Sequence, residues 1–260
     1  MPIDKSTPVP LYYQLAEHIR GRIDAGHLAP GAQLPSEREL GEEWGISRMT
    51  ARQAITYLVR QGRLVARPGI GTFVAEPKLT HDTWHLLGFT EEMLRQGQAA
   101  YSRVIEQTRL AAPADVARRL GLGAEAAVTK IVRLRYSGTT PLLLETVFVA
   151  QSLAPRLEQA DLAQASLYLL LEQQYGLQLD HAAQSLEAIT ANAFEAEQFG
   201  IPLGSLMLLL EGVTYTRAGQ PAEFFKAVYR GDKFKFELES QRSSGPAAHG
   251  ALPRLSVVMR

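Results

Sequence analysis

The sequence contains no cysteine among its 260 residues. This absence excludes disulfide bonds, thiol nucleophiles and cysteine-type zinc sites, and it is typical of a protein from a reducing compartment. No apolar run reaches the roughly 18 residues of a membrane-spanning helix. The amino-terminal segment MPIDKSTPVP also lacks the apolar core of a signal peptide. We therefore expect a cytoplasmic protein that does not contact a membrane.

Net charge is absent as well, because 27 Lys+Arg balance 27 Asp+Glu. The balance is not uniform along the chain. Residues 45–74 hold five arginines and no acid, although residues 1–76 as a whole hold nine basic and eight acidic residues. Positive charge is therefore concentrated in one part of the sequence. This local concentration, and not the isoelectric point, indicates a binding partner of negative charge.

The amino-terminal residues have the pattern of a small helical domain that ends in a hairpin. Apolar residues recur at helical spacing over residues 10–26, Ser36 and Glu39 have the spacing of a capping box, and Ser47 begins a further helix. Two short extended runs then surround the turn PGIG. Three helices and a hairpin predict a winged helix-turn-helix over residues 1–75.

The remaining residues predict a second domain, which fits the chain length and 46% hydrophobic residues. Helices are expected where Thr90 and Ser166 stand at N-cap positions, and strands form hairpins around the turns SGTT and RAGQ. Strands grouped in this way favour an antiparallel α+β fold. We assign a linker to residues 76–88, the second domain to residues 89–240 and a flexible tail to residues 241–260.

Arg48 and Arg52 lie one helical turn apart on the second helix of the predicted helix-turn-helix, so they project from one face. Thr50 lies beside them, and Ser47 offers a hydroxyl at a free helix N-terminus. A guanidinium can pair with guanine in the major groove or bind phosphate, whereas an acid would face phosphates about 1.7 Å apart along the duplex axis. The pattern predicts a DNA-binding face. A solvated basic helix is the alternative, which the capped helix and the hairpin beside it disfavour.

The segment LPSERELGEEWGISRMTARQAITYLVRQGRLVARPGIGTFV resembles the DNA-binding domain of the GntR family of bacterial transcription regulators, over about residues 8–75. The resemblance implies DNA contacts from Arg38, Arg48, Thr50 and Arg52. It also implies that the wing turn at Gly69 and Gly71 enters the minor groove. Family members bind pseudo-palindromic operators as homodimers, and we expect the same here.

Polar residues interrupt the apolar strands of the second domain. In TKIVRLRYS, Arg133 and Arg135 alternate with apolar residues, so both guanidiniums emerge from one sheet face with Cα atoms about 7 Å apart. Two cations this close indicate an anion between them. Glu145 interrupts the run PLLLETVFV, and Glu223 and Tyr229 share one face of PAEFFKAVYRGD. Alternatively, the arginines belong to a solvated strand face, with Glu145 as a cross-strand ion-pair partner and no ligand.

The motifs FTEEM, VRLR, SLY and KAVYRGDKF resemble the UTRA effector-binding domain of the HutC subfamily, over roughly residues 84–240. The resemblance implies a chorismate-lyase-like antiparallel sheet with helices, and it is nearest to regulators that respond to phosphorylated glucosamine or N-acetylglucosamine. By this likeness the phosphate is held by Thr90, Arg133, Arg135, Ser166 and Tyr168. The hydroxyl and amine or amide groups of the sugar are met by Glu145, Glu223 and Tyr229. A relative that senses urocanate, a fatty acid or another sugar phosphate would have a similar sequence.

Motifs of other function classes are missing. The sequence has no serine–histidine–aspartate set, no paired carboxylates and no phosphate loop, because the glycines of GIGTF lie in a hairpin. Only His81 and His85 have metal-ligand spacing, and we expect them to lie in the linker without a metal. We therefore expect no enzyme, no cofactor and no metal site. An architectural DNA binder without a ligand is the rival interpretation, and effector titration distinguishes the two.

These observations favour a regulator, specifically a repressor, that a small anionic effector releases from double-stranded operator DNA. We expect the effector to draw the helix ends at Thr90 and Ser166 toward the arginines and to move the linker. The two reading helices of the dimer would then no longer match the half-site spacing. This requires the effector to bind the DNA-free arrangement better than the DNA-bound one.

Overall fold

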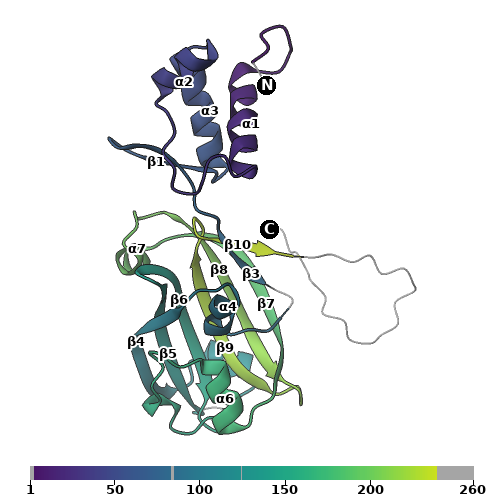
Figure 1. The fold of residues 1–260 in the computed structure, drawn as a ribbon. Helices are drawn as coiled ribbons and strands as arrows, with labels where there is room; N and C mark the ends of the chain where they lie inside the picture. The colour runs from purple at the N-terminus through teal and green to yellow at the C-terminus, as the bar shows by residue number, and fades with distance from the viewer. Residues whose placement is uncertain (1–2, 83–84, 124, 239–260) are drawn as a thin grey trace, which may run out of the picture.

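A computed structural model gives the structure of the protein and describes residues 3–82, 85–123 and 125–238. The predicted tail at residues 241–260 lies outside these residues. Figure 1 shows an amino-terminal group of three helices and a larger unit built on a sheet. None of the helices within the described ranges is long and apolar enough to span a membrane.

The amino-terminal unit is a winged helix-turn-helix, as the sequence predicts. Its elements are α1 (Leu11–Asp24), α2 (Glu37–Trp44), α3 (Arg48–Arg60), β1 (Leu64–Arg67) and β2 (Gly71–Val74), the two strands being antiparallel. Ser36 accepts a hydrogen bond from the N–H of Glu39, whose carboxylate accepts one from the N–H of Ser36. Ser47 accepts a hydrogen bond from the N–H of Thr50. Both predicted caps are therefore confirmed, and they fix where α2 and α3 begin.

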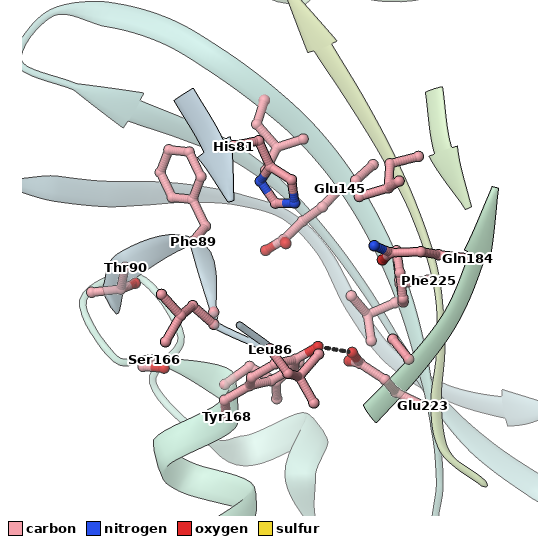
Figure 2. A pocket seen from close by; sticks show the side chains of 18 of the residues that line it. His81, Leu86, Phe89, Thr90, Glu145, Ser166, Tyr168, Gln184, Glu223 and Phe225 are labelled. Atoms are coloured by element: carbon pink, nitrogen blue, oxygen red, sulfur yellow. Dashed lines mark hydrogen bonds between the residues drawn. The ribbon is translucent and has the colours of Figure 1, made fainter. Parts of the chain in front are cut away.

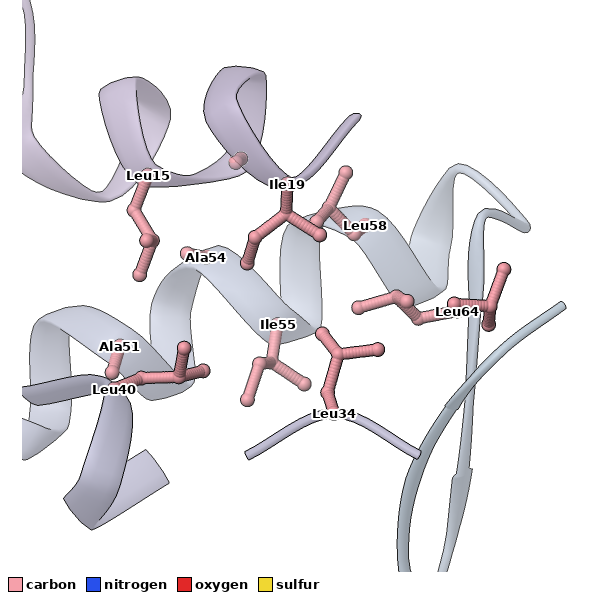
Figure 3. Close-up of a cluster of buried hydrophobic side chains, with 11 residues drawn as sticks. Leu15, Ile19, Leu34, Leu40, Ala51, Ala54, Ile55, Leu58 and Leu64 are labelled. Carbon is pink, nitrogen blue, oxygen red and sulfur yellow. The ribbon is translucent and has the colours of Figure 1, made fainter. Parts of the chain in front are cut away.

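One apolar core joins these helices to the wing (Figure 3). Leu15 and Ile19 of α1 pack with Ala54 and Leu58 of α3, and Leu64 at the start of β1 joins the same cluster. All five side chains are buried, because each helix repeats its apolar residues on one face. Burial of these faces, more than intrinsic propensity, stabilises helices this short. The opposite face of α3 is therefore free to carry polar side chains.

The second unit is a six-stranded antiparallel sheet in the order β4-β5-β6-β9-β8-β7. Its strands are β4 (Ala100–Ala111), β5 (Ala127–Ser137), β6 (Thr140–Ala150), β7 (Leu179–Thr190), β8 (Leu206–Thr216) and β9 (Pro221–Arg230). The helices described beside it are α4 (Phe89–Arg95), α5 (Ala114–Leu120), α6 (Leu167–Tyr175), α7 (Ala193–Phe199) and the 3-10 turn η1 (Leu157–Gln159). The expected antiparallel α+β fold is confirmed.

A second pair of strands ties the segment after the winged helix to the sheet unit. β3 (Leu79–Asp82) runs parallel to β10 (Phe234–Glu237) and lies within the residues predicted as a linker. The N–H of Leu79 donates to the carbonyl of Lys233 at 2.7 Å, and Lys78 Nζ donates to the carbonyl of Gly231 at 2.7 Å. Only residues 75–78 separate β2 of the wing from β3.

Candidate functional site

The predicted DNA-binding face lies on α3, where the side chains of Arg48 and Arg52 are 73% and 64% exposed. The surface is not free of acid, contrary to the expectation drawn from residues 45–74. Glu37 at the start of α2 approaches both arginines, with 3.0 Å from Arg48 Nε to Oε2 and 3.9 Å from Arg52 Nε to Oε1. The expectation was wrong because the acid comes from the neighbouring helix. These exposed ion pairs contribute little to stability, so the guanidiniums can exchange them for DNA.

The other residues predicted to contact DNA lie around the same surface. Ser47 and Thr50 are hydrogen-bonded to one another at the start of α3, with 2.8 Å between their hydroxyl oxygens. Arg38 of α2 is exposed and forms an ion pair with Glu42 at 2.8 Å. One open groove runs between α2 and the wing, and it is lined by residues that include Arg38, Arg48, Arg67, Gly69 and Gly71.

The wing turn depends on glycine at two positions. Gly69 has φ 74°, and Gly71 has φ 145°. A Cβ atom on Gly71 would lie 2.5 Å from Nε2 of Gln33, which itself donates to the carbonyl of Ile70 at 3.2 Å. Gln33 therefore contacts the turn, and a larger residue at 71 would have to displace this side chain and adopt a φ angle that favours glycine.

A cavity of about 210 Å³ lies in the sheet unit (Figure 2). All the residues predicted to bind the effector line it: Thr90, Arg133, Arg135, Glu145, Ser166, Tyr168, Glu223 and Tyr229. They come from α4, β5, β6, the start of α6 and β9, elements that are far apart in sequence. The antiparallel pairing of β6 with β9 brings the two halves of the chain together, with Glu145 opposite Ala227.

The arginine pair is buried at one end of this cavity. Arg133 and Arg135 are 1% and 2% exposed, so the alternative of a solvated strand face is wrong. Oε1 of Glu145 lies 2.5 Å from Arg133 Nη2 and 2.8 Å from Arg135 Nη1. Burial lowers the pKa of Arg133 to about 10, and the guanidiniums hold the pKa of Glu145 below its usual value although burial raises it. Arg133 and Glu145 are therefore both charged near neutral pH.

The hydroxyl groups near the arginines have different environments. Arg135 Nη2 donates to Oγ1 of Thr90 at 2.6 Å. Ser166 caps α6 as expected, accepting a hydrogen bond from the N–H of Leu169. Thr90, in contrast, is not an N-cap. Helix α4 begins one residue earlier, at Phe89, because Gly88 adopts the cap conformation and its N–H donates to the Glu91 carboxylate.

A second acid, Glu223, occupies the other end of the cavity. Its Oε1 accepts hydrogen bonds from the hydroxyls of Tyr168, at 2.7 Å, and Thr214, at 2.9 Å. Its Oε2 is buried and has no partner among the described residues. Burial raises the pKa of Glu223 to about 7, although the two hydrogen bonds lower it. An unpaired buried oxygen of this kind is costly unless a ligand donates to it.

The raised pKa of Glu223 makes stability depend on pH in a defined direction. Because the native carboxyl holds its proton up to about pH 7 and the unfolded one only to its ordinary value of 4.5, the native state binds more protons between these values. The contribution of Glu223 to the free energy of unfolding is then most favourable below pH 4.5 and falls as pH rises toward about 7. We expect the stability gain of Glu223→Gln over the natural protein to grow across this window, as measured by urea unfolding.

Glu187→Gln, which removes an exposed carboxylate from β7, is the matched control for this prediction. Its unfolding free energy should follow that of the natural protein at every pH. A constant difference between Glu223→Gln and the natural protein across the window would contradict the assigned environment of Glu223.

Sequence reasoning missed some residues that line the cavity. His81, considered only as a metal ligand, stands on β3 with its Nδ1 2.9 Å from Oε2 of Glu92. Its ring lies 4.7 Å from that of Phe236 and 5.3 Å from that of Tyr229. No cluster of three or more metal-binding side chains occurs in the part of the chain that the structure describes. Gln184 of β7 also lines the cavity, and it was missed because β7 itself was not predicted.

Comparison with known proteins agrees with this architecture. Residues 11–74 match the bacterial regulatory proteins of the gntR family, and residues 95–235 match the UTRA domain. The HTH-type transcriptional repressor NagR of Bacillus subtilis is 38% identical over 236 residues, which cover 91% of this chain and 97% of NagR. The histidine utilization repressor of Pseudomonas putida is 30% identical over 230 residues, covering 88% and 92%. The crystal structure of PhnF from Mycobacterium smegmatis has a TM-score of 0.61 and 26% identity, covering 88% of this chain and 99% of PhnF.

These similarities extend over both units of the chain and separate a regulator from an enzyme. The amino-terminal family consists of operator-binding proteins, and the UTRA domain binds small-molecule effectors. NagR and the histidine utilization repressor, which are similar over both units, are named as repressors. The chain belongs to the GntR family of bacterial transcription regulators and, through its UTRA domain, to the HutC subfamily near NagR.

Proposed function

We propose that this regulator is a homodimeric repressor that a phosphorylated amino sugar releases from its operator. The observation that carries the proposal is the pairing, in one cavity, of a buried guanidinium pair with a buried carboxyl oxygen that has no partner within the described part of the chain. The first group calls for an anion and the second for a hydrogen-bond donor. A phosphorylated amino sugar has both on one small molecule.

The arginine end suits a phosphate. Two guanidiniums face one carboxylate there, so one positive charge remains in excess. The hydroxyls of Thr90 and Ser166 line the same cavity and can donate to phosphate oxygens. The Tyr168 hydroxyl, which donates to Glu223, would have to leave that carboxyl to reach the phosphate. Charge-assisted hydrogen bonds in a buried site are among the strongest that a protein forms with a ligand.

The other end suits an amine, an amide or a hydroxyl. Glu223 Oε2 needs a donor, and Tyr229 lines the cavity further along β9, beside His81. A fatty acid would satisfy the arginines but would bury its apolar chain against Glu223, leaving the oxygen unpaired. This cost disfavours a purely apolar carboxylate.

On the DNA side, we assign contacts to Arg38, Ser47, Arg48, Thr50 and Arg52, with the wing turn at Gly69 and Gly71. The exposed face of α3 suits the major groove, where each well-formed bidentate contact contributes about 1–3 kcal/mol of discrimination. Ser47 and the N-terminal turn of α3 suit a phosphate, which positions the helix without reading sequence.

The route from the cavity to the DNA runs through α4 and β3. Thr90 of α4 accepts a hydrogen bond from Arg135, and Glu92 of the same helix contacts His81 of β3. A ligand that accepts from Arg135 in place of Thr90 breaks this hydrogen bond. It therefore removes a contact of α4, the helix that contacts β3. Displacement of β3 would change the spacing of the two winged helices in the dimer. The effect requires a ligand that binds the DNA-free arrangement more tightly.

Titration of the DNA complex with effectors tests this function. An operator is first selected from genomic fragments, and its complex with the full chain is followed by fluorescence anisotropy. We expect N-acetylglucosamine 6-phosphate or glucosamine 6-phosphate to weaken operator binding about 5- to 150-fold, the usual range of allosteric coupling. Unphosphorylated sugars should have no effect. Release by urocanate alone, or by no compound of either class, would refute the proposal, and sedimentation of the complex tests the homodimer.

A further inference from the structure

The anion-binding end of the cavity is already filled by a side chain of the protein. A single oxygen, Oε1 of Glu145, accepts from Arg133 Nη2 and Arg135 Nη1. The remaining terminal nitrogens are engaged as well, because Arg133 Nη1 lies 3.4 Å from the carbonyl of Leu162 and Arg135 Nη2 donates to Thr90. The Nε atoms of both arginines have no partner among the described residues but are buried. Each terminal nitrogen still carries a second N–H, so donors remain for an incoming anion, but they lie beside the bound carboxylate of Glu145.

The sheet register places this carboxylate between the arginines. Glu145 of β6 is the direct cross-strand partner of Arg133 of β5, and its side chain is 12% exposed. Figure 2 shows its carboxylate reaching into the cavity, on the side toward Thr90 and Ser166. The two guanidiniums hold its pKa below the ordinary value, so it remains negative at neutral pH. The negative charge is thus a constant feature of the site.

An anion that enters must compete with the Glu145 carboxylate for the N–H groups of the arginines. It must also lie beside the negative charge of that carboxylate. A displaced buried carboxylate is costly unless new donors reach it. Inorganic phosphate carries a negative charge and has only its own one or two hydroxyls to donate, so it leaves Glu145 in repulsion. A ligand that carries hydroxyl or amino groups next to its phosphate can donate to Glu145 while its phosphate binds the arginines.

We infer that Glu145 is an internal counter-anion that makes the site reject inorganic phosphate and accept only anions that bring their own hydrogen-bond donors. This inference rests on the proposed function, which places an anion at the arginine pair. It adds a specificity role to the sugar contact that the family resemblance implies for Glu145. A sensor of a phosphorylated metabolite needs such a device, because free phosphate has the same anionic group.

Binding of inorganic phosphate and sulfate to the full chain tests the inference by isothermal calorimetry. We expect Glu145→Gln to bind either ion about tenfold or more tightly than the natural protein, since the competing charge is gone but the side-chain shape is kept. Glu187→Gln is the matched control, because it makes the same change at an exposed position of β7 that does not line the cavity. It should bind either ion within about threefold of the natural protein. Equal affinity of Glu145→Gln and the natural protein for both ions would overturn the inference.

A second measurement applies if Glu145→Gln does not fold. The natural protein is titrated with methyl phosphate and with N-acetylglucosamine 6-phosphate, which differ in the donors they carry. We expect methyl phosphate to bind at least about 100-fold more weakly, and affinities within about tenfold of one another would overturn the inference. Failure of the proposed function is seen separately, as the absence of operator release by any phosphorylated amino sugar.

Discussion

Replacing Arg133 with methionine is expected to leave operator binding intact and to weaken the response to effector about 10- to 100-fold. The factor corresponds to the loss of one charge-assisted hydrogen-bonding group, about 1.5–3 kcal/mol. Arg133 is buried in the effector cavity, whereas the proposed DNA contacts lie on the amino-terminal unit. The variant should thus remain on its operator at effector concentrations that release the natural protein, as measured by fluorescence anisotropy.

The matched control for this experiment is Arg109→Met, which removes an exposed arginine from β4. It should respond to effector as the natural protein does. Loss of Arg133 also leaves Glu145 with Arg135 alone, so the variant is expected to melt at a lower temperature. Its operator affinity without effector shows whether it is folded at the assay temperature. Normal release of a folded Arg133→Met variant would remove the arginine pair from the effector site.

The parts of the fold that follow from sequence are those with local signals. Two helix starts are predicted by cap residues, one by Ser36 with Glu39 and one by Ser47. The hydrogen bonds of both caps lie within one turn, and all of these bonds form. The turn PGIG similarly specifies the wing, because its glycines adopt positive φ angles. Such signals depend on the chain within a few residues, so no knowledge of the tertiary fold is required.

The edge strands β4 and β7 have no comparable signal. β7 has the sequence LDHAAQSLEAIT, in which alanine, glutamine and glutamate favour strands weakly and most residues are exposed. Its strand conformation comes from pairing with β8 over nearly its whole length. A strand stabilised by its neighbour in this way is visible only when the sheet is assembled. The helix α7 and the four-residue strand β3 were missed as well, and β3 carries His81.

The candidate effector site was predictable in its members but not in its geometry. Alternation along β5 places Arg133 and Arg135 on one face, and this pattern is visible in the sequence. Their burial is not, since it requires Glu145 from β6 and the cover of α4 and α6. No local pattern predicts that Glu223 reaches the same cavity. It does so because β9 pairs with β6, and about half of the second unit's sequence lies between these two strands.

Replacing Arg48 or Arg52 with alanine is expected to reduce strongly the preference for operator over random DNA. Each bidentate base contact is worth about 1–3 kcal/mol, so each substitution should weaken specific binding about 5- to 150-fold. The lost free energy is little reduced by the ion pairs with Glu37, because pairs this exposed contribute about 0–1 kcal/mol. Anisotropy titrations with operator and with scrambled DNA measure the effect.

Arg118→Ala, an exposed arginine on α5 in the sheet unit, is the matched control and should bind operator normally. The salt dependence then separates the two kinds of DNA contact. A guanidinium that binds phosphate releases counterions. Its removal therefore makes the fall of log affinity with log salt less steep, by about 0.9 in slope. A guanidinium that reads guanine changes the preference among sequences more than the slope. If Arg48→Ala and Arg52→Ala kept the full preference of the natural protein for operator over scrambled DNA, α3 would not be the reading helix.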